Sequence, residues 1–361
     1  MESSPLHYLP QDTLHHIFSH LPLSQIILCR SVCKFFNQTL TSPSFLALIS
    51  TRSPLHLIAL RPSHHHQRQS FLNIFDPNLN QWLKFSLAFL PHKVPIPVAS
   101  SNGLVYIWAE SNDFGGKSLV VCNPLTRQFR VLPQLGSAWS RHGTVLVGKG
   151  KRVLVLTELA AIYFSGSGDS WFKFSSNLPS KPRSPILVSD SVFALCDVGS
   201  LWRSQWKLFT CTLTDLEKSR GWNRLEKHEW GDVFDILKRP RLIQGTSNRI
   251  LMVGGLKSSF SLTASCSTIL ILRLDLDALE WEEAGRMPLD MYKCFQESSK
   301  FKVFGGEDRV CFSAKRVEGL AMWDCSSEAG KGEWKWIDGV PGNGDGLCRG
   351  FVFEAKLNAV P

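Results

Sequence analysis

One pattern repeats six times downstream of Pro54: a short apolar run, a polar turn, and a second run that carries an aromatic residue. Short runs bounded by Gly, Pro, Asn, Asp and Ser are typical of β-strands. The aromatic residues recur roughly every 50 residues, a period that favours propeller blades over leucine-rich or ankyrin repeats. They are Trp82, Phe129, Trp171, Trp222, Trp281 and Trp334. The chain has 12 Trp and 23 Phe but four Tyr, which fits because buried aromatics fill the cores of large repetitive β folds.

A further apolar run precedes most copies, as in 103–108 and 249–253, so each copy supplies about four strands. Six copies therefore predict a mainly β protein, with a roughly six-bladed β-propeller over residues 51–361. The strand-like segment near 349–357 has no partner after it. We expect it to pair with the first blade near 55–60, because a ring of sheets otherwise leaves an open edge.

Residues 1–50 follow a different, helical pattern. The first piece begins near Pro10 and places its apolar residues at i, i+3, i+4 and i+7, which indicates an amphipathic helix; these residues are Leu14, Ile17, Phe18 and Leu21. A second piece follows Ser24 and a short third piece starts at Ser44. So small a unit cannot cover both of its apolar faces. From spacing alone, the uncovered face contacts either a partner protein or the propeller, as a helical cap.

The order Leu9-Pro10, Leu21-Pro22 and Val32-Cys33-Lys34 resembles the F-box, the motif that docks on the Skp-type adaptor of SCF ubiquitin ligases. The resemblance covers about residues 5–50 and identifies 1–50 as a three-helix F-box. Phe36 stands where the family usually has Trp, a change that keeps a large aromatic but removes the indole N–H. The resemblance implies an adaptor-binding face made of Leu9, Pro10, Leu14, Ile17, Leu21, Pro22, Val32, Cys33, Lys34 and Phe36.

Two glycine pairs, Gly254-Gly255 and Gly305-Gly306, resemble the double glycine of kelch repeats, whereas the other copies lack a clear pair. The whole chain thus resembles the plant F-box/kelch-repeat family, including proteins of the Unusual Floral Organs type. The resemblance implies a substrate-recognition subunit of an SCF E3 ubiquitin ligase. Its F-box would bind a Skp-type adaptor, and through it the cullin and RING subunits, while the kelch-like propeller binds a target protein.

Target binding is expected in loops on one face of the propeller, because strand side chains are used by the core. The candidate target-binding residues are Arg141, His142, Trp202, Arg203, Lys238, Arg239 and Arg241. The net charge of +9 lies downstream of residue 50. The alternative function is therefore a transcriptional cofactor or a non-ligase scaffold that uses the basic propeller. Direct nucleic-acid binding is not otherwise indicated, because Lys and Arg are scattered rather than gathered in a run.

No catalytic residues, cofactor or metal are expected. Cys29 and Cys33 lack further ligands nearby, and 143–150 has Gly where a P-loop needs Ser or Thr. Some kelch propellers are secreted copper oxidases with tyrosine ligands, but this chain has four Tyr and no signal-like N-terminus. No apolar run reaches the length of a membrane span, so no membrane partner is expected. We expect a nuclear or cytoplasmic protein, or one present in both, with free thiols.

Overall fold

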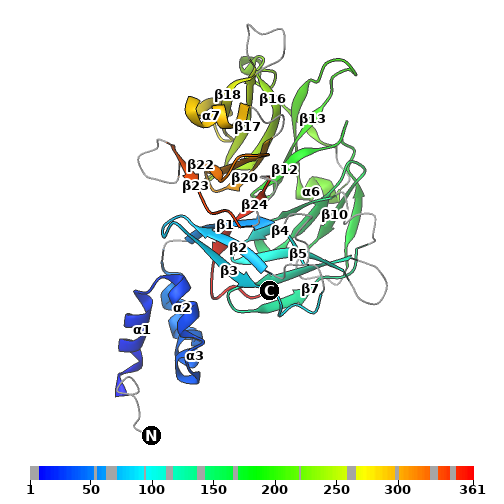
Figure 1. The fold of residues 1–361 in the computed structure, drawn as a ribbon. Coiled ribbons are helices and arrows are strands. Elements are labelled where there is room, and N and C mark those ends of the chain that lie inside the picture. Colours follow the sequence, from blue (N-terminus) through cyan, green and yellow to red (C-terminus); the bar gives the residue numbers. More distant parts are fainter. Residues whose placement is uncertain are drawn as a thin grey trace.

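This computed structural model describes residues 8–52, 55–61, 71–92, 95–110, 117–135, 143–165, 170–218, 221–257, 266–296, 301–325, 332–341 and 347–361. The N-terminal helices stand to one side of a ring of β-sheets, and the chain then runs round the ring (Figure 1). Every strand pairing described is antiparallel.

The ring consists of six four-stranded sheets, which confirms the six-bladed propeller. The first three blades contain β24 (Arg349–Ala355), β1 (Leu55–Arg61), β2 (Phe71–Asp76) and β3 (Gln81–Ser86); β4 (Ile96–Ser101), β5 (Leu104–Glu110), β6 (Lys117–Asn123) and β7 (Gln128–Val131); and β8 (Thr144–Val147), β9 (Val153–Leu156), β10 (Ala160–Phe164) and β11 (Phe172–Ser175). The last three contain β12 (Arg183–Val188), β13 (Ser191–Asp197), β14 (Trp206–Thr212) and β15 (Asn223–Leu225); β16 (Leu237–Gln244), β17 (Arg249–Lys257), β18 (Cys266–Asp275) and β19 (Glu280–Arg286); and β20 (Phe301–Gly306), β21 (Arg309–Ala314), β22 (Leu320–Asp324) and β23 (Glu333–Ile337).

The inner strands of the blades are β24, β4, β8, β12, β16 and β20. Each contacts the inner strand of both neighbouring blades, so the six form a closed ring. They surround a central cavity of about 690 Å³.

The two ends of the propeller meet in the first blade. β24 pairs with β1 along its whole length, from Leu55 opposite Ala355 to Arg61 opposite Arg349. Phe353 of β24 is 0% exposed. A strand from the C-terminus therefore supplies the innermost element of a sheet that otherwise comes from the start of the propeller, and no open sheet edge remains between the first and last blades.

The aromatic repeat has a structural cause. The Trp82 indole Nε1 donates to the Asp338 carbonyl of the preceding blade at 2.8 Å, and Trp171 Nε1 donates in the same way to the Pro133 carbonyl at 2.8 Å. Trp222 Nε1 donates to the Ser176 carbonyl of its preceding blade. In these three blades the aromatic residue thus joins each sheet to its neighbour, and the N–H of a half-buried indole has a hydrogen-bond partner.

The polar turns of the repeat also have a defined role. The Asp76, Asn123 and Asp275 Oδ1 atoms each accept the backbone N–H two residues later, at 2.9, 3.0 and 2.9 Å. Such Asx turns reverse the chain between the third and fourth strands of a blade. The short polar side chain therefore sets the register of the strand that carries the aromatic residue.

The N-terminal unit contains four α-helices: α1 (Gln11–Ser19), α2 (Leu23–Cys29), α3 (Lys34–Thr41) and α4 (Pro43–Ser50). The sequence predicted three helical pieces, and the structure divides the second of them at Cys33. This residue is extended, with φ −157° and ψ 166°, and its Sγ accepts the Phe36 N–H at the start of α3. Ser42 caps α4 by accepting the Phe45 N–H at 3.3 Å. Local capping thus divides a segment for which the spacing of apolar residues alone predicts one helix.

Among the described residues, helices α6 (Leu213–Glu217) and α7 (Leu289–Gln296) follow β14 and β19. In the part of the chain that the structure describes, no helix combines the length and the hydropathy needed to cross a membrane.

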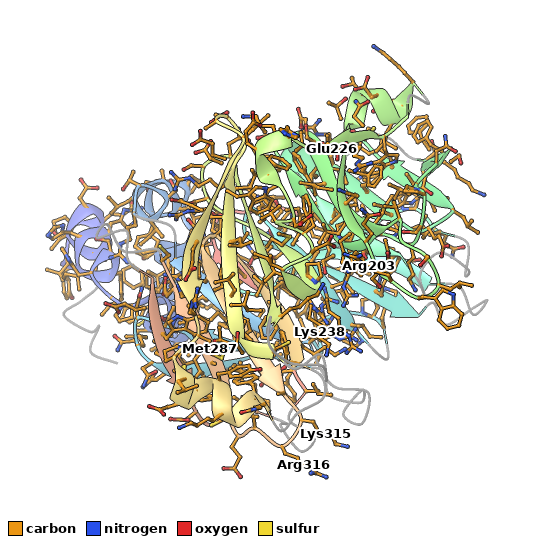
Figure 2. The ribbon with its side chains drawn as sticks, turned by 90° about the horizontal axis from the view of Figure 1, so that it is seen from above. Arg203, Glu226, Lys238, Met287, Lys315 and Arg316 are labelled. Atoms are coloured by element: carbon orange, nitrogen blue, oxygen red, sulfur yellow. The ribbon has the colours of Figure 1, made fainter. Side chains whose placement is uncertain are left out.

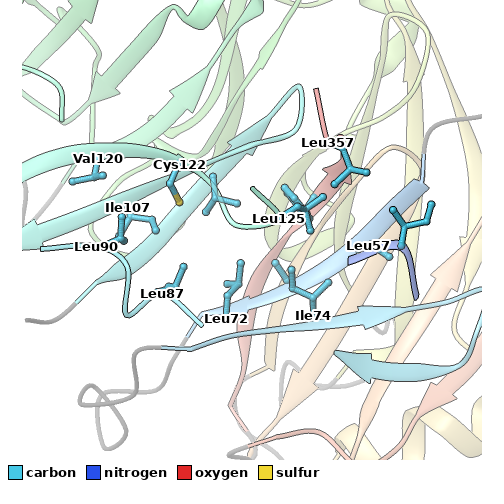
Figure 3. Packing of buried hydrophobic residues seen from close by; sticks show 14 of the residues in the cluster. Leu57, Leu72, Ile74, Leu87, Leu90, Ile107, Val120, Cys122, Leu125 and Leu357 are labelled. Carbon is cyan, nitrogen blue, oxygen red and sulfur yellow. The ribbon is translucent and has the colours of Figure 1, made fainter. Parts of the chain in front are cut away.

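One hydrophobic cluster joins the N-terminal helices to the first two blades. Its propeller part includes Leu57 and Leu72 of the first blade and Ile107 and Cys122 of the second (Figure 3). The cluster continues into the helices through Leu14, Phe18, Ile26, Leu40 and Phe45. The helical unit therefore packs on the propeller instead of extending from it on a free linker.

Replacing Phe353 by Ala should lower the free energy of unfolding by about 3–5 kcal/mol, because a fully buried ring in the closing strand is lost. Chemical denaturation followed by tryptophan fluorescence measures this change. The control is Val360→Ala in the same terminal segment, where the side chain is 63% exposed and an effect within about 0.5 kcal/mol is expected. Equal effects of the two variants would contradict a closing role for β24.

Candidate functional site

Helix α1 presents different residues to the core and to the surface. Pro10 precedes the helix, and its carbonyl accepts the Leu14 N–H at 3.1 Å. Leu14 is 2% exposed and Phe18 6%, whereas Ile17 is 46% exposed. The sequence analysis placed these three on one face, but the structure turns Ile17 outward. Leu14 thus supports packing of the helices, and Ile17 is exposed at the surface.

Three further large apolar side chains between residues 9 and 33 are exposed, Leu9 at 36%, Leu28 at 66% and Val32 at 67%, and Leu48 of α4 is 40% exposed. Val32 lies in the turn after α2, where its N–H donates to the Cys29 carbonyl at 3.1 Å. Leu28 was absent from the predicted residues, although its spacing of four from Val32 is the usual signal of a shared helical face. We call Leu9, Ile17, Leu28 and Val32 the exposed apolar set. Several exposed apolar residues on so short a segment indicate an interaction surface.

The other predicted adaptor residues occupy mixed positions. Pro10, Cys33 and Lys34 are exposed, while Leu21 and Pro22 are half-buried. Phe36 is also half-buried, with its ring 5.0 Å from that of Phe18 at an interplanar angle of 74°. This edge-to-face geometry places Phe36 against the interior of the helical unit.

Arg30 connects the helical unit to the second blade. Its Nη1 donates to the Leu125 carbonyl, in the turn between β6 and β7, at 3.4 Å. Burial lowers the pKa of Arg30, and the nearby charge of Arg127 lowers it further. Ile27 packs on the shared hydrophobic cluster at the same junction. One face of the helical unit thus packs against the propeller.

A cavity of about 750 Å³ lies at this junction. Leu46 and Ile49 of α4 line it on one side, and Leu79, Tyr106 and Leu357 of the propeller line it on the other. The sequence left open whether the helices cover the propeller or bind a partner. The structure shows contact with the propeller on one face and the exposed apolar set elsewhere, so the unit can do both.

The inner strands define two faces of the propeller. The helical unit precedes Leu55, which pairs with Ala355 at the end of β24. Arg349 begins β24 and therefore lies at the opposite face. We call the face where the inner strands begin the strand-start face. The helical unit and this face lie on opposite sides of the ring.

Five of the predicted target-binding residues lie on the strand-start face. Trp202 is 95% exposed and Arg203 is also exposed, in the loop between β13 and β14. Lys238 and Arg239 are exposed at the beginning of β16, and Arg241 is half-buried on the same strand. Figure 2 shows Lys238 on a side of the propeller away from the N-terminal helices. The other two, Arg141 and His142, lie outside the described residues.

Three arginines on this face were missed by the sequence analysis: Arg61, Arg183 and Arg349. Arg61 and Arg349 are direct cross-strand partners on β1 and β24, and Arg183 begins β12. With Arg239 and Arg241 they form what we call the arginine cluster. Only the arrangement of the strands reveals it, because its members come from four strands that are distant in sequence.

The arginines of the cluster affect one another's protonation. Burial, followed by the charges of Arg241 and Arg239, lowers the pKa of Arg183 to about 10. Burial and the charge of Arg349 lower the pKa of Arg61 to about 10. The pKa of Arg241 is also lowered, by burial first and then by Arg349 and Arg239. The cluster thus holds positive charges together that repel one another.

The described residues contain no group of three or more His, Cys, Asp or Glu side chains suited to hold a metal ion. Within the segment 143–150, residues Thr144–Val147 form the inner strand β8. A phosphate-binding loop does not fit there, because such a loop follows a strand and opens a helix.

Comparison with known proteins agrees with this architecture. Residues 6–48 match the model of the F-box domain. The chain therefore has the organisation of an F-box/propeller protein, an F-box followed by a six-bladed propeller. The chain belongs to the F-box protein family: it is 64% identical to SKP1-interacting partner 15 of Arabidopsis thaliana over 100% of both chains.

Two more distant relatives match over most of their own length. Protein UNUSUAL FLORAL ORGANS of Arabidopsis thaliana is 23% identical over 97% of this chain and 85% of its own. An F-box/kelch-repeat protein of the same plant, At5g43190, is 26% identical over 92% of this chain and 82% of its own. The predicted resemblance to plant F-box/kelch-repeat proteins is therefore confirmed.

The variants Leu14→Ala and Ile17→Ala should distinguish a side chain of α1 that supports helix packing from one that is exposed to solvent. We expect Leu14→Ala to lower the free energy of unfolding by about 2–5 kcal/mol because it opens a cavity in the shared cluster. Ile17→Ala should change it by about 0.5 kcal/mol or less, since the side chain is largely in solvent. Denaturant titration of the two variants measures both values. A larger loss for Ile17→Ala would show that α1 is rotated from the orientation described.

Proposed function

We propose that this protein is the substrate-recognition subunit of an SCF E3 ubiquitin ligase. The observation that carries the proposal is the exposed apolar set on a helical unit that matches the F-box domain. Apolar anchors on short helices suit docking into a groove of a partner. The relative that is 64% identical bears the name SKP1-interacting partner 15, which supports a Skp-type adaptor as the partner here.

The adaptor contact is assigned to Leu9, Ile17, Leu28 and Val32, with Pro10, Cys33 and Lys34 beside them. Leu14 and Phe36 act indirectly, because they hold the helices that carry the exposed residues. Leu21 and Pro22 are half-buried at the start of α2, and Pro22 also lines the cavity toward the propeller. Through the adaptor, the complex would include the cullin and RING subunits.

The geometry also suits a receptor that binds its adaptor and its target on separate faces. The helical unit and the strand-start face lie on opposite sides of the ring. A target held on the strand-start face would leave the adaptor contact free. Catalysis then belongs to the ubiquitin-conjugating enzyme of the assembly, and this chain contributes by raising the effective concentration of a target lysine.

Replacing Ile17 and Val32 together by Asp should weaken binding of a Skp-type adaptor by at least about 100-fold, because two charges would enter an apolar contact. The full chain is used, and affinity is measured by calorimetry or by surface plasmon resonance. Thermal unfolding should change little, since both side chains are exposed. This pair of substitutions therefore tests the contact without opening the helical core.

The matched control is Val131→Asp with Leu201→Asp, two exposed apolar positions on the propeller. It adds the same charge and should retain wild-type adaptor affinity. If the wild-type chain fails to bind the adaptor, or if the Ile17 and Val32 variant binds as tightly as the control, the proposed receptor function is wrong.

A further inference from the structure

The strongest unassigned feature of the molecule is the arginine cluster at the strand-start face. Its members come from four strands, β1, β12, β16 and β24. Arg61 and Arg349 face each other directly across a strand pair, an arrangement that destabilises a sheet when the charges are alike. β12 and β16 are adjacent inner strands, which brings Arg183 near Arg239 and Arg241. The fold thus brings these positive charges together, although each strand taken separately would tolerate a neutral residue at the same position.

The cluster lacks the carboxylate partners that other arginines of the propeller have. Arg273 pairs with Glu282 at 2.6 Å, and Arg309 pairs with Asp324 at 3.0 Å. Within the described part of the chain, no Asp or Glu lies within ion-pair distance of any of the five clustered arginines. The charge of Asp197 acts on Arg183, but the Asp197 Oδ1 accepts backbone N–H groups of its own loop.

Arg61 connects the cluster to the central cavity. It lines the cavity of about 690 Å³, and its Nη2 donates to the Val98 carbonyl. Its Nε, however, is buried and has no hydrogen-bond partner among the described residues. A buried guanidinium donor without a partner is unfavourable, and a ligand that accepts hydrogen bonds at this end of the cavity would correct the deficit.

The two ends of the cavity differ in charge. Arg61 lies at the strand-start end, whereas His56, Glu307 and Glu354 line the other end. Burial raises the pKa of Glu307, and the charges of Asp308 and Glu354 raise it further. An anion is therefore attracted to the strand-start end and repelled from the opposite end, so the cavity has a preferred side of entry.

The backbone at the cluster is also unusual. Arg239 has a φ of +54° within the irregular pairing between Lys238 and Arg241. A non-glycine residue in this left-handed region is strained, and β-bulges are enriched beside functional sites because they redirect side chains. The strained residue lies within the cluster itself, and it is one of the positions that the sequence analysis selected for target binding.

We infer that the arginine cluster is the anchoring site for an anionic peptide segment of the target protein, whose carboxylate or phosphate groups enter the strand-start end of the cavity. The guanidinium group suits both anions because its planar donors can bind two oxygens at once. A mouth framed by inner strands can admit a peptide side chain, whereas a nucleic-acid duplex is far wider. The inference rests on the proposed receptor function only in taking the ligand from a target protein.

The test uses the purified full chain without adaptor and three fluorescein-labelled probes of equal length: hexaglutamate, hexaglutamine and a glutamine peptide with two phosphoserines. Binding is measured by fluorescence anisotropy. The salt concentration is about 0.15 M, which screens weak contacts between exposed charges. We expect binding of hexaglutamate or of the phosphoserine peptide, and none of hexaglutamine. Preference between the two anionic probes identifies carboxylate or phosphate as the recognised group, and either preference supports the inference.

The diagnostic variant is Arg241→Gln with Arg349→Gln. Affinity for the anionic probe should fall by at least about tenfold because charge-assisted hydrogen bonds are lost. The melting temperature should stay the same or rise by about 1–3 °C, because repulsion within the cluster is relieved. A merely structural role for these arginines predicts the reverse, a fall in melting temperature. The matched control is Arg130→Gln with Lys218→Gln, which removes equal charge from exposed positions elsewhere.

Absence of binding by both anionic probes would overturn the inference, as would an equal loss of affinity in the control variant. Displacement of the anionic probe by single-stranded DNA at lower concentration than by unlabelled peptide would also overturn it, in favour of a nucleic-acid site. Adaptor affinity is measured on the same variants. If adaptor binding persists while peptide binding fails, the receptor function stands and only the anionic-target inference is lost.

Discussion

Pairing of β24 with β1 is the constraint on which the rest of the structure depends. Seven cross-strand pairs connect residues almost 300 positions apart, and they turn an open series of sheets into a closed ring. The tail after β24 is fixed as well, because the buried Asn123 Nδ2 donates to the Lys356 and Ala359 carbonyls at 2.9 Å each. Closure thus positions the inner strands, and through them both faces of the propeller.

The same closure determines how the helical unit is held. The helices pack on the blade that contains the chain junction and on the next one, through a shared hydrophobic cluster and the Arg30 contact to Leu125. A partner bound to the exposed apolar set would therefore have a defined orientation relative to the strand-start face. This rigidity suits a protein that must hold one macromolecule at a fixed distance from another.

The strand-start face shows how stability and binding can oppose each other. Clustered arginines that repel one another lower the stability of the folded state, yet their charges remain available because no described carboxylate pairs with them. Arginines elsewhere in the propeller, such as Arg273 and Arg309, have such partners. The difference between the two groups lies in their location at the mouth of the cavity, and that location is why we assign the cluster to a ligand.

The sequence by itself determined the class of fold and the kind of helical motif. Aromatic residues at regular intervals predicted the blades, and in three blades the indole at this position donates to a carbonyl of the preceding blade, as Trp82 and Trp171 do. The Leu-Pro and Val-Cys-Lys elements indicated the F-box because their order and spacing resemble the motif of that family. These features depend on residues close together in the chain, or on a repeated spacing.

Tertiary structure alone decided which side chains are available. Leu14 and Ile17 have equivalent apolar character and lie one turn apart, but packing against α3, α4 and the shared cluster buries the first and leaves the second exposed. The arginine cluster was equally invisible, because Arg61, Arg183 and Arg349 become neighbours only when the ring closes. Burial and long-range charge depend on contacts between distant segments, and neither spacing nor composition records those contacts.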